Sequence, residues 1–264
     1  MGAVNLPLRK YRNNYSPLRY FVRLSYLGTN FHGWQIQPNA VSVQEELNRT
    51  LSTILGEEIG VVGAGRTDTG VHAKEMWAHF DAQKALPENL LHRVNSFIGK
   101  DIAVYEFVKV GDEAHARFDA VERSYEYHFT TLKNPFLQGL AWYFPWTVDI
   151  AKMQQAAEVL TQFEDFTSFS KTNTQTFTNL CSIKEARFEI KEEVFVFHIT
   201  ANRFLRNMVR AIVGTLVEIG QGKRDVAEMQ KIIEAKDRRL AGESAPAHGL
   251  YLTRVTYPKE IFNG

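Results

Sequence analysis

The sequence has a single cysteine, no long hydrophobic run and no acidic residue near its start. Because Cys181 stands alone among the 264 residues, an internal disulfide and a cysteine-based zinc site are both excluded. No apolar run approaches the roughly 20 residues that a membrane-spanning helix needs. The first 20 residues contain four basic side chains but no apolar signal-peptide core. We therefore expect a soluble, cytoplasmic protein that has no membrane partner.

Acidic residues are missing from the first 44 positions, where five arginines and lysines lie. A second basic segment, residues 203–224, holds five arginines and lysines and only one acid, Glu218. The net charge of the whole chain is +1 at pH 7, so these two segments stand out against a nearly neutral background. Basic clusters of this kind favour a binding site for a polyanion such as a nucleic acid. A solvated basic face is the alternative that composition leaves open.

Hydrophobic periodicity in the first half predicts a mixed order of strands and helices. The expected order is strand, helix, strand, strand, helix, strand, at residues 20–27, 43–55, 59–62, 74–80, 87–98 and 102–110. Ser42 and Glu45 form a capping box at the start of the first helix. This order is the split βαβ pattern of ferredoxin-like units, which RNA-recognition modules also use.

The second half repeats this theme without a visible sequence repeat. Its expected elements are a strand, a helix, a hairpin of two strands, two helices and a strand, at residues 118–131, 150–163, 183–190, 194–200, 203–219, 226–235 and 251–257. A polar, glycine-containing break at 111–113 separates a basic extension (1–16) and an N-terminal domain (17–112) from a C-terminal domain (113–264). The predicted fold class is α+β, with two ferredoxin-like (RRM-like) halves whose antiparallel sheets flank a central catalytic cleft.

A glycine-rich loop at residues 63–73, Gly-Ala-Gly-Arg-Thr-Asp-Thr-Gly-Val-His-Ala, carries the strongest sign of chemistry. It places the carboxylate of Asp68 near Arg66 and between two threonines. Glycine lets a backbone approach a ligand closely, and threonine hydroxyls can fix the direction of a neighbouring carboxylate. Because strands are expected on both sides, the loop has a position in which functional residues are often carried. A structural turn, in which Asp68 only satisfies backbone donors, is the alternative.

Two known motifs resemble parts of this loop, and neither fits. Asp68-Thr69-Gly70 is the tripeptide of aspartic proteases, which need two carboxylates that share a proton. This long chain holds one copy, and the nearby Arg66 favours an ionised Asp68, which is wrong for such a pair. The run at 63–66 lacks the Gly-Lys-Ser/Thr ending of a phosphate-binding loop and the third glycine of a dinucleotide fingerprint. Neither a protease nor a nucleotide hydrolase is expected.

Two further groups can act together with this loop. Arg203, Arg206 and Arg210 are expected on one face of the helix at 203–219. There they can clamp phosphates, pair with a carboxylate or simply form a solvated face. Tyr125 is expected on a strand next to an arginine, where its ring can stack on an unpaired base or fill the core.

Residues 65–73, Gly-Arg-Thr-Asp-Thr-Gly-Val-His-Ala, resemble the signature of the tRNA pseudouridine synthase A (TruA) family. Four further segments resemble the other motifs of this family and occur in the family's order, at residues 31–38, 116–127, 204–210 and 245–250. The resemblance runs from near residue 20 to near residue 255, and residues 1–16 match none of these motifs.

The resemblance implies an enzyme that isomerises uridine to pseudouridine at positions 38, 39 and 40 of the tRNA anticodon stem-loop. It implies no cofactor, no metal and a homodimer. By motif position it implies that Asp68 is the essential catalytic aspartate and that Arg210 pairs with it. Tyr125 would pack against the target base, and Arg66 would help to hold the extruded nucleotide. A non-catalytic RNA-binding module of the same fold is the alternative from another class, although the acid Asp68 would only repel phosphate there.

Overall fold

The computed structural model describes residues 17–171 and 178–263, so the predicted basic extension 1–16 lies outside the described residues. The strands are β1 (Leu18–Tyr26), β2 (Val62–Gly63), β3 (His72–Ala82), β4 (Ile102–Lys109), β5 (Glu122–Thr130), β6 (Trp142–Tyr143), β7 (Ile183–Lys191), β8 (Val194–Ala201) and β9 (Leu250–Thr256). The α-helices are α1 (Val43–Leu55), α2 (Leu90–Phe97), α3 (Ile150–Val159), α4 (Met208–Gly220) and α5 (Glu228–Ala235). This mixture confirms the predicted α+β class.

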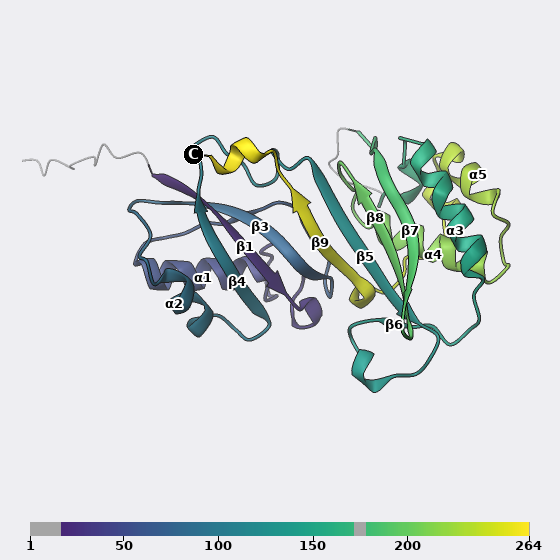
Figure 1. Cartoon of the computed structure of the whole chain (residues 1–264), viewed down its shortest axis with the longest axis horizontal. Coiled ribbons are helices and arrows are strands. Elements are labelled where there is room, and N and C mark those ends of the chain that lie inside the picture. Colours follow the sequence, from purple (N-terminus) through teal and green to yellow (C-terminus); the bar gives the residue numbers. More distant parts are fainter. Residues whose placement is uncertain (1–16, 172–177, 264) are drawn as a thin grey trace, which may run out of the picture.

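The strands form one large, mostly antiparallel sheet in the order β4-β1-β3-β9-β5-β8-β7. β2 pairs with β3 and β6 pairs with β5, both outside this path. The last strand, β9, lies in the middle of the sheet between β3 and β5 (Figure 1). It runs antiparallel to β5 but parallel to β3, to which it pairs through His72 with Tyr251 and Ala73 with Leu252. The end of the chain therefore joins both halves of the sequence into one sheet.

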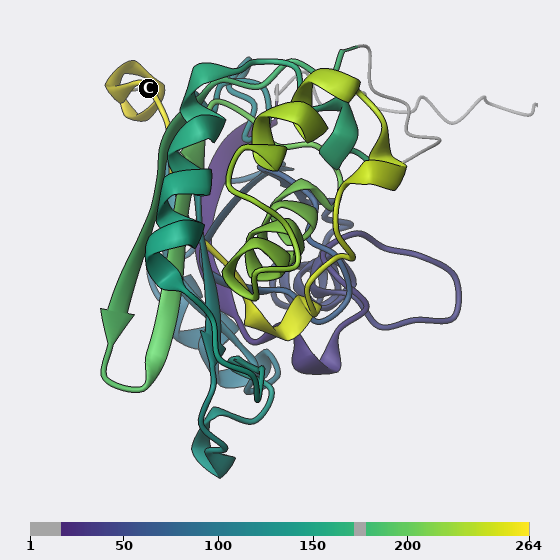
Figure 2. The same ribbon diagram turned by 90° about the vertical axis from the view of Figure 1, so that its right-hand side faces the viewer.

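Hydrophobic side chains pack in two cores. The first lies around β1, β3, α1 and α2 and includes Phe21 and Phe80, and the second lies around β5, β8, α3 and α4 and includes Phe129. Tyr125 packs against both cores. In side view α4 and α5 lie on one side of the sheet (Figure 2). None of the helices within the described ranges is long and apolar enough to cross a membrane.

Helix α1 begins and ends where the sequence predicts. The Ser42 hydroxyl accepts a hydrogen bond from the Glu45 N–H at 3.2 Å, which caps the first turn. Gly56 follows the helix with a φ of 72°, a conformation that glycine adopts without a steric cost. Leu47 and Leu51 are buried at helical spacing and hold the helix on the first core.

The helix expected at 203–219 begins later than predicted. Asn207 has a positive φ of 66° and precedes α4, so the helical path does not extend back through it. The prediction of three arginines on one helical face is therefore wrong. Arg203 and Arg206 precede the helix, and Arg210 lies in its first turn.

Candidate active site

The loop that carries Asp68 connects β2 to β3 and packs closely against the loop after β1. Gly33 has a φ of 86°, and a Cβ atom there would lie 2.4 Å from the carbonyl oxygen of Thr67. The same oxygen accepts a hydrogen bond from the Trp34 N–H at 3.2 Å. The hydroxyls of Thr67 and Tyr26 are hydrogen-bonded at 2.9 Å. These contacts fix the backbone on which Asp68 is held.

His72 ties this loop to three other segments. It is buried, and its Nδ1 accepts a hydrogen bond from the Gly28 N–H at 3.0 Å. The opposite nitrogen, Nε2, donates to the carbonyl oxygens of Gly139 at 3.0 Å and His248 at 3.1 Å. Burial lowers the pKa of His72, which agrees with a neutral ring protonated on Nε2. The structure thus gives His72 a role in holding loops together.

Asp68 forms an ion pair with an arginine from the second half of the chain. Its side chain is 30% exposed, and Arg210 Nη1 lies 3.4 Å from Asp68 Oδ2. Arg210 Nε donates to the carbonyl oxygen of Ala245 at 2.7 Å, and the Ala245 N–H donates to the carbonyl oxygen of Arg210 at 3.0 Å. Gly214 allows this approach, because a Cβ atom there would lie 1.7 Å from the carbonyl oxygen of Glu243. Helix α4 and the segment before β9 together place the guanidinium.

A second arginine, Arg206, also reaches Asp68, with Nε 3.8 Å from Oδ1. Its side chain is 62% exposed and lies just before α4. Sequence reasoning assigned Arg206 no separate role, because motif position carries the pairing with Asp68 to Arg210 alone. The loop between Phe204 and α4 is what brings it over the carboxylate.

The two neighbouring tyrosines of β5 have different surroundings, which the sequence left open. Tyr127 is fully buried, and its hydroxyl donates to the carbonyl oxygen of Pro246 at 2.8 Å, so it fills the core. Tyr125 is partly exposed and makes an edge-to-face contact with Phe204 at 5.1 Å. Burial raises the pKa of Tyr125 to about 12, and the charge of Asp68 acts in the same direction. Tyr125 is therefore a neutral ring near the carboxylate.

Arg66, in the loop of Asp68, and Arg123, on β5, differ in their contacts. Arg66 is exposed and makes no hydrogen bond or ion pair with another residue in the described part of the chain. Arg123, which the sequence did not single out, donates to four backbone carbonyl oxygens, those of Ala64, Arg117, Ala120 and Asn202. Arg123 thus joins the start of β5 to the segment that leads to Asp68.

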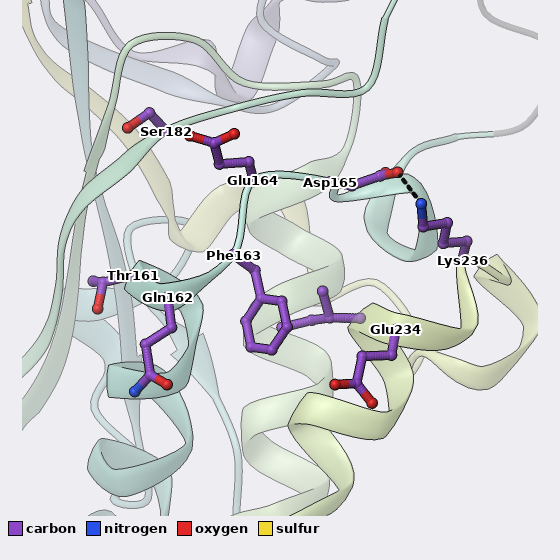
Figure 3. Close-up of a pocket in the computed structure, with 9 residues that line it drawn as sticks. Thr161, Gln162, Phe163, Glu164, Asp165, Ser182, Glu234 and Lys236 are labelled. Carbon is purple, nitrogen blue, oxygen red and sulfur yellow. Dashed lines mark ion pairs between the residues drawn. The ribbon is translucent and has the colours of Figure 1, made fainter.

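A hollow of about 620 Å³ opens elsewhere, beside the end of α5 (Figure 3). Three of its side chains, Glu164, Asp165 and Glu234, are acidic, and Lys236 pairs with Asp165 at 2.8 Å. The lining is therefore negative overall and does not suit a polyanion. No residue of the loop before β3 lines it, so this hollow is separate from the Asp68 site.

The Asp68 site combines a carboxylate, two guanidinium groups and an aromatic ring. A carboxylate can act as a nucleophile or a base, guanidinium groups bind phosphates, and an aromatic ring stacks on a base. Across 17–171 and 178–263, no three His, Cys, Asp or Glu side chains are grouped as ligands for a metal ion. The arrangement suits a reaction on an unstacked nucleotide.

Known proteins are similar to this chain over most of its length. A family model described as tRNA pseudouridine synthase matches residues 156–258. The chain is 49% identical over 246 residues to tRNA pseudouridine synthase A of Parabacteroides distasonis, covering 92% of this chain and 98% of that protein. The protein of the same name from Porphyromonas gingivalis is 49% identical over 249 residues, with 92% and 99% covered. That from Legionella pneumophila is 38% identical over 248 residues, with 92% and 94% covered.

These similarities extend over most of the chain. They confirm the prediction of a pseudouridine synthase, an isomerase, over that of a non-catalytic RNA-binding module. The chain belongs to the tRNA pseudouridine synthase A family.

Proposed function

We propose that this isomerase converts uridine to pseudouridine at positions 38, 39 and 40 of the tRNA anticodon stem-loop, with Asp68 as its catalytic carboxylate. The observation that carries the proposal is the contact of Asp68 with Arg210, in which Nη1 lies 3.4 Å from Oδ2. The reaction breaks the N1–C1′ bond, turns the base and joins it again through C5. Substrate and product are isomers, so no oxidant, reductant or water is consumed.

Asp68 acts on the target nucleotide itself in this proposal. Its carboxylate can attack C1′, add to C6 of the base or remove the C2′ proton, and each step needs a negatively charged oxygen. Arg210 stabilises that charge from 3.4 Å, and its own hydrogen bond to Ala245 keeps the guanidinium in place. Arg210 is thus the ionic partner of the catalytic aspartate.

A uridine in a stem must leave its stack before Asp68 can reach it, at a cost of a few kcal/mol. Stacking on an aromatic ring returns about 1–3 kcal/mol per base, and we assign this role to Tyr125. The contact with Phe204 supports the assignment, because it limits the orientations of the ring. Arg66, which is exposed, is assigned to the extruded nucleotide or its backbone.

The proposal includes two ferredoxin-like halves, residues 17–112 and 113–264, on either side of a catalytic cleft. Strand order supports it, since β4-β1-β3-β2 in the first half corresponds to β9-β5-β8-β7 in the second. The two hydrophobic cores, each formed mainly by one half, are a second support, although Leu252, Val255 and Tyr257 pack in the first core and Val71 packs in the second. We further propose that the enzyme is cytoplasmic and a homodimer, in which both subunits can hold one tRNA.

Tritium release tests the proposed position, because C5 of the target uridine loses its hydrogen when the base is rejoined. The substrates are tRNA transcripts labelled with 5-[³H]uridine in which the residues at positions 38, 39 and 40 are cytidine, singly or together. We expect release from every transcript that keeps a uridine at one of the three positions and none from the triple replacement. Undiminished release from the triple replacement would place the modified uridine elsewhere.

A further inference from the structure

Two arginines approach the two oxygens of Asp68, and the structure holds them very differently. Arg210 Nη1 is 3.4 Å from Oδ2, and the side chain is 21% exposed. Arg206 Nε is 3.8 Å from Oδ1, which is beyond hydrogen-bonding distance, and the side chain is 62% exposed. The guanidinium of Arg206 has no other ionic or hydrogen-bonding partner in residues 17–171 and 178–263.

The exposure of Arg206 makes its contact with Asp68 easy to exchange. Water screens such a surface pair and competes for both groups, so pairs of this kind contribute little to stability. Within residues 17–171 and 178–263, none of the five N–H donors of the Arg206 guanidinium has a hydrogen-bond acceptor, so these donors are available to a ligand. Arg210 differs, because its Nε already donates to Ala245 at 2.7 Å.

The charged side chains at the site have a net positive charge, which favours the binding of an anion. Asp68 contributes one negative charge, and Arg206 and Arg210 contribute two positive charges, which gives a net charge of +1. A nucleotide that enters the site brings a phosphate with one negative charge. Guanidinium and phosphate form strong, often bidentate, charge-assisted hydrogen bonds, whereas the present contact of Arg206 with Asp68 is a long one.

We propose that Arg206 is a substrate-binding residue that exchanges Asp68 for a phosphate next to the target uridine when tRNA binds. This inference rests on the proposed function of the Asp68 site. In the free enzyme Arg206 stays near Asp68 Oδ1. In the complex it holds the backbone of the extruded nucleotide, while Arg210 remains on Oδ2 and Oδ1 is free to act.

The test compares Arg206→Gln, Arg206→Lys and a matched control, Arg187→Gln. Arg187 is 47% exposed and pairs with Glu185 at 2.6 Å, so it is also an exposed arginine beside a carboxylate. Ala186 packs into the second core, and the alternation of β7 therefore directs Arg187 to the opposite face of the sheet. Its loss removes a similar charge far from the proposed contact.

Binding of unmodified tRNA transcript is measured over a range of salt concentrations. We expect Arg206→Gln to weaken binding about tenfold, as the loss of one charge-assisted hydrogen bond does. The slope of log affinity against log salt should become shallower by about 0.7 to 0.9, the value for one lost phosphate contact. Arg206→Lys, which keeps the charge, should restore the slope, and Arg187→Gln should behave as the wild type.

Tritium release under the same conditions separates binding from chemistry. The KM of Arg206→Gln for tRNA should rise by the factor lost in binding, with a much smaller change in kcat. A salt slope equal to that of the wild type would overturn the proposal. Loss of kcat with unchanged binding would overturn it as well, because Arg206 would then act only on Asp68. A wild-type enzyme that binds tRNA without releasing tritium would contradict the proposed function instead, and the slope comparison would still stand.

Discussion

Asp68 and Arg210 are 142 residues apart in the sequence, and yet Arg210 Nη1 lies 3.4 Å from Asp68 Oδ2. The contact joins the loop before β3 to the first turn of α4, and so joins both halves of the chain. The carbonyl oxygen of Ala245 accepts a hydrogen bond from Nε of the same arginine, which fixes its direction. Three distant segments therefore determine where the charge next to Asp68 lies.

Replacement of Arg210 by glutamine should lower turnover about 100-fold, the cost typical of removing one preorganised charged or hydrogen-bonding group. Binding of tRNA should change much less, because Arg210 is aimed at Asp68 and Ala245. Single-turnover tritium release at saturating tRNA measures the first effect, and filter binding measures the second. Near-normal turnover in this variant would remove Arg210 from the mechanism.

Replacement of Tyr125 by leucine should impair extrusion of the target uridine, because leucine offers no aromatic surface. The expected loss is about 1–3 kcal/mol of stacking free energy, while Tyr125→Phe should keep most of it. Fluorescence of 2-aminopurine placed next to the target reports extrusion directly. Tyr143→Leu is a suitable control, since Tyr143 is an exposed tyrosine on β6. Equal fluorescence changes in wild type and Tyr125→Leu would contradict the stacking role.

Replacement of Gly33 by alanine should displace the loop of Asp68. Gly33 has a φ of 86°, and the new Cβ atom would lie 2.4 Å from the carbonyl oxygen of Thr67. Strain of this kind costs on the order of 1–3 kcal/mol. Gly60→Ala is the control, because no atom lies within 4 Å of a Cβ atom there. Gly33→Ala alone should unfold at a lower urea concentration and release tritium more slowly. Equal behaviour of the two variants would show that the close contact is unimportant.

The stability of the protein should decrease on mild acidification, in part through His79. This side chain is buried, and its Nδ1 accepts a hydrogen bond from the Ala116 N–H at 3.1 Å. Burial, followed by the nearby charges of His115 and Arg19, lowers the pKa of His79 to about 4. An unfolded histidine titrates near pH 6.5, so the unfolded chain takes up this proton first as the pH falls. The stability that depends on a neutral His79 is fully present above about pH 6.5 and is lost as the pH falls from there to about pH 4.

The variant His79→Asn isolates this contribution, because asparagine can still accept the hydrogen bond from Ala116 but does not titrate. Urea unfolding at several pH values between 6.5 and 4 gives the free energy of unfolding. As the pH is lowered, the free energy of unfolding should decrease less steeply in the variant than in the wild type, by up to about 1.4 kcal/mol per pH unit. The same steepness in both proteins would mean that His79 is not the group responsible.

Local signals in the sequence were sufficient to predict many of the helices and strands. The capping box of Ser42 and Glu45 and the spacing of Leu47 and Leu51 predicted α1 with its observed ends, because these interactions lie within one helix. The loop around Asp68 was likewise identified from neighbouring residues. Its place between two strands follows from short-range alternation, although β2 is shorter than expected.

The contacts that complete the site depend on segments far apart in the chain, and periodicity does not place these. The left-handed backbone of Asn207 interrupts the expected helix, and hydrophobic spacing gives no sign of it. The position of Arg206 over Asp68 follows from that interruption. His72 and Arg123 donate to carbonyl oxygens of remote loops, and backbone carbonyls carry no sequence signal.

Comparison of the wild type with Asp68→Asn tests the role of the carboxylate directly. Asparagine has nearly the same shape as aspartate but no charge, so the loop should keep its structure. We predict that the wild type releases tritium from 5-[³H]uridine-labelled tRNA and that Asp68→Asn releases none, while it binds tRNA at least as tightly. Release by Asp68→Asn at the wild-type rate would show that the Asp68 carboxylate does not carry out the reaction.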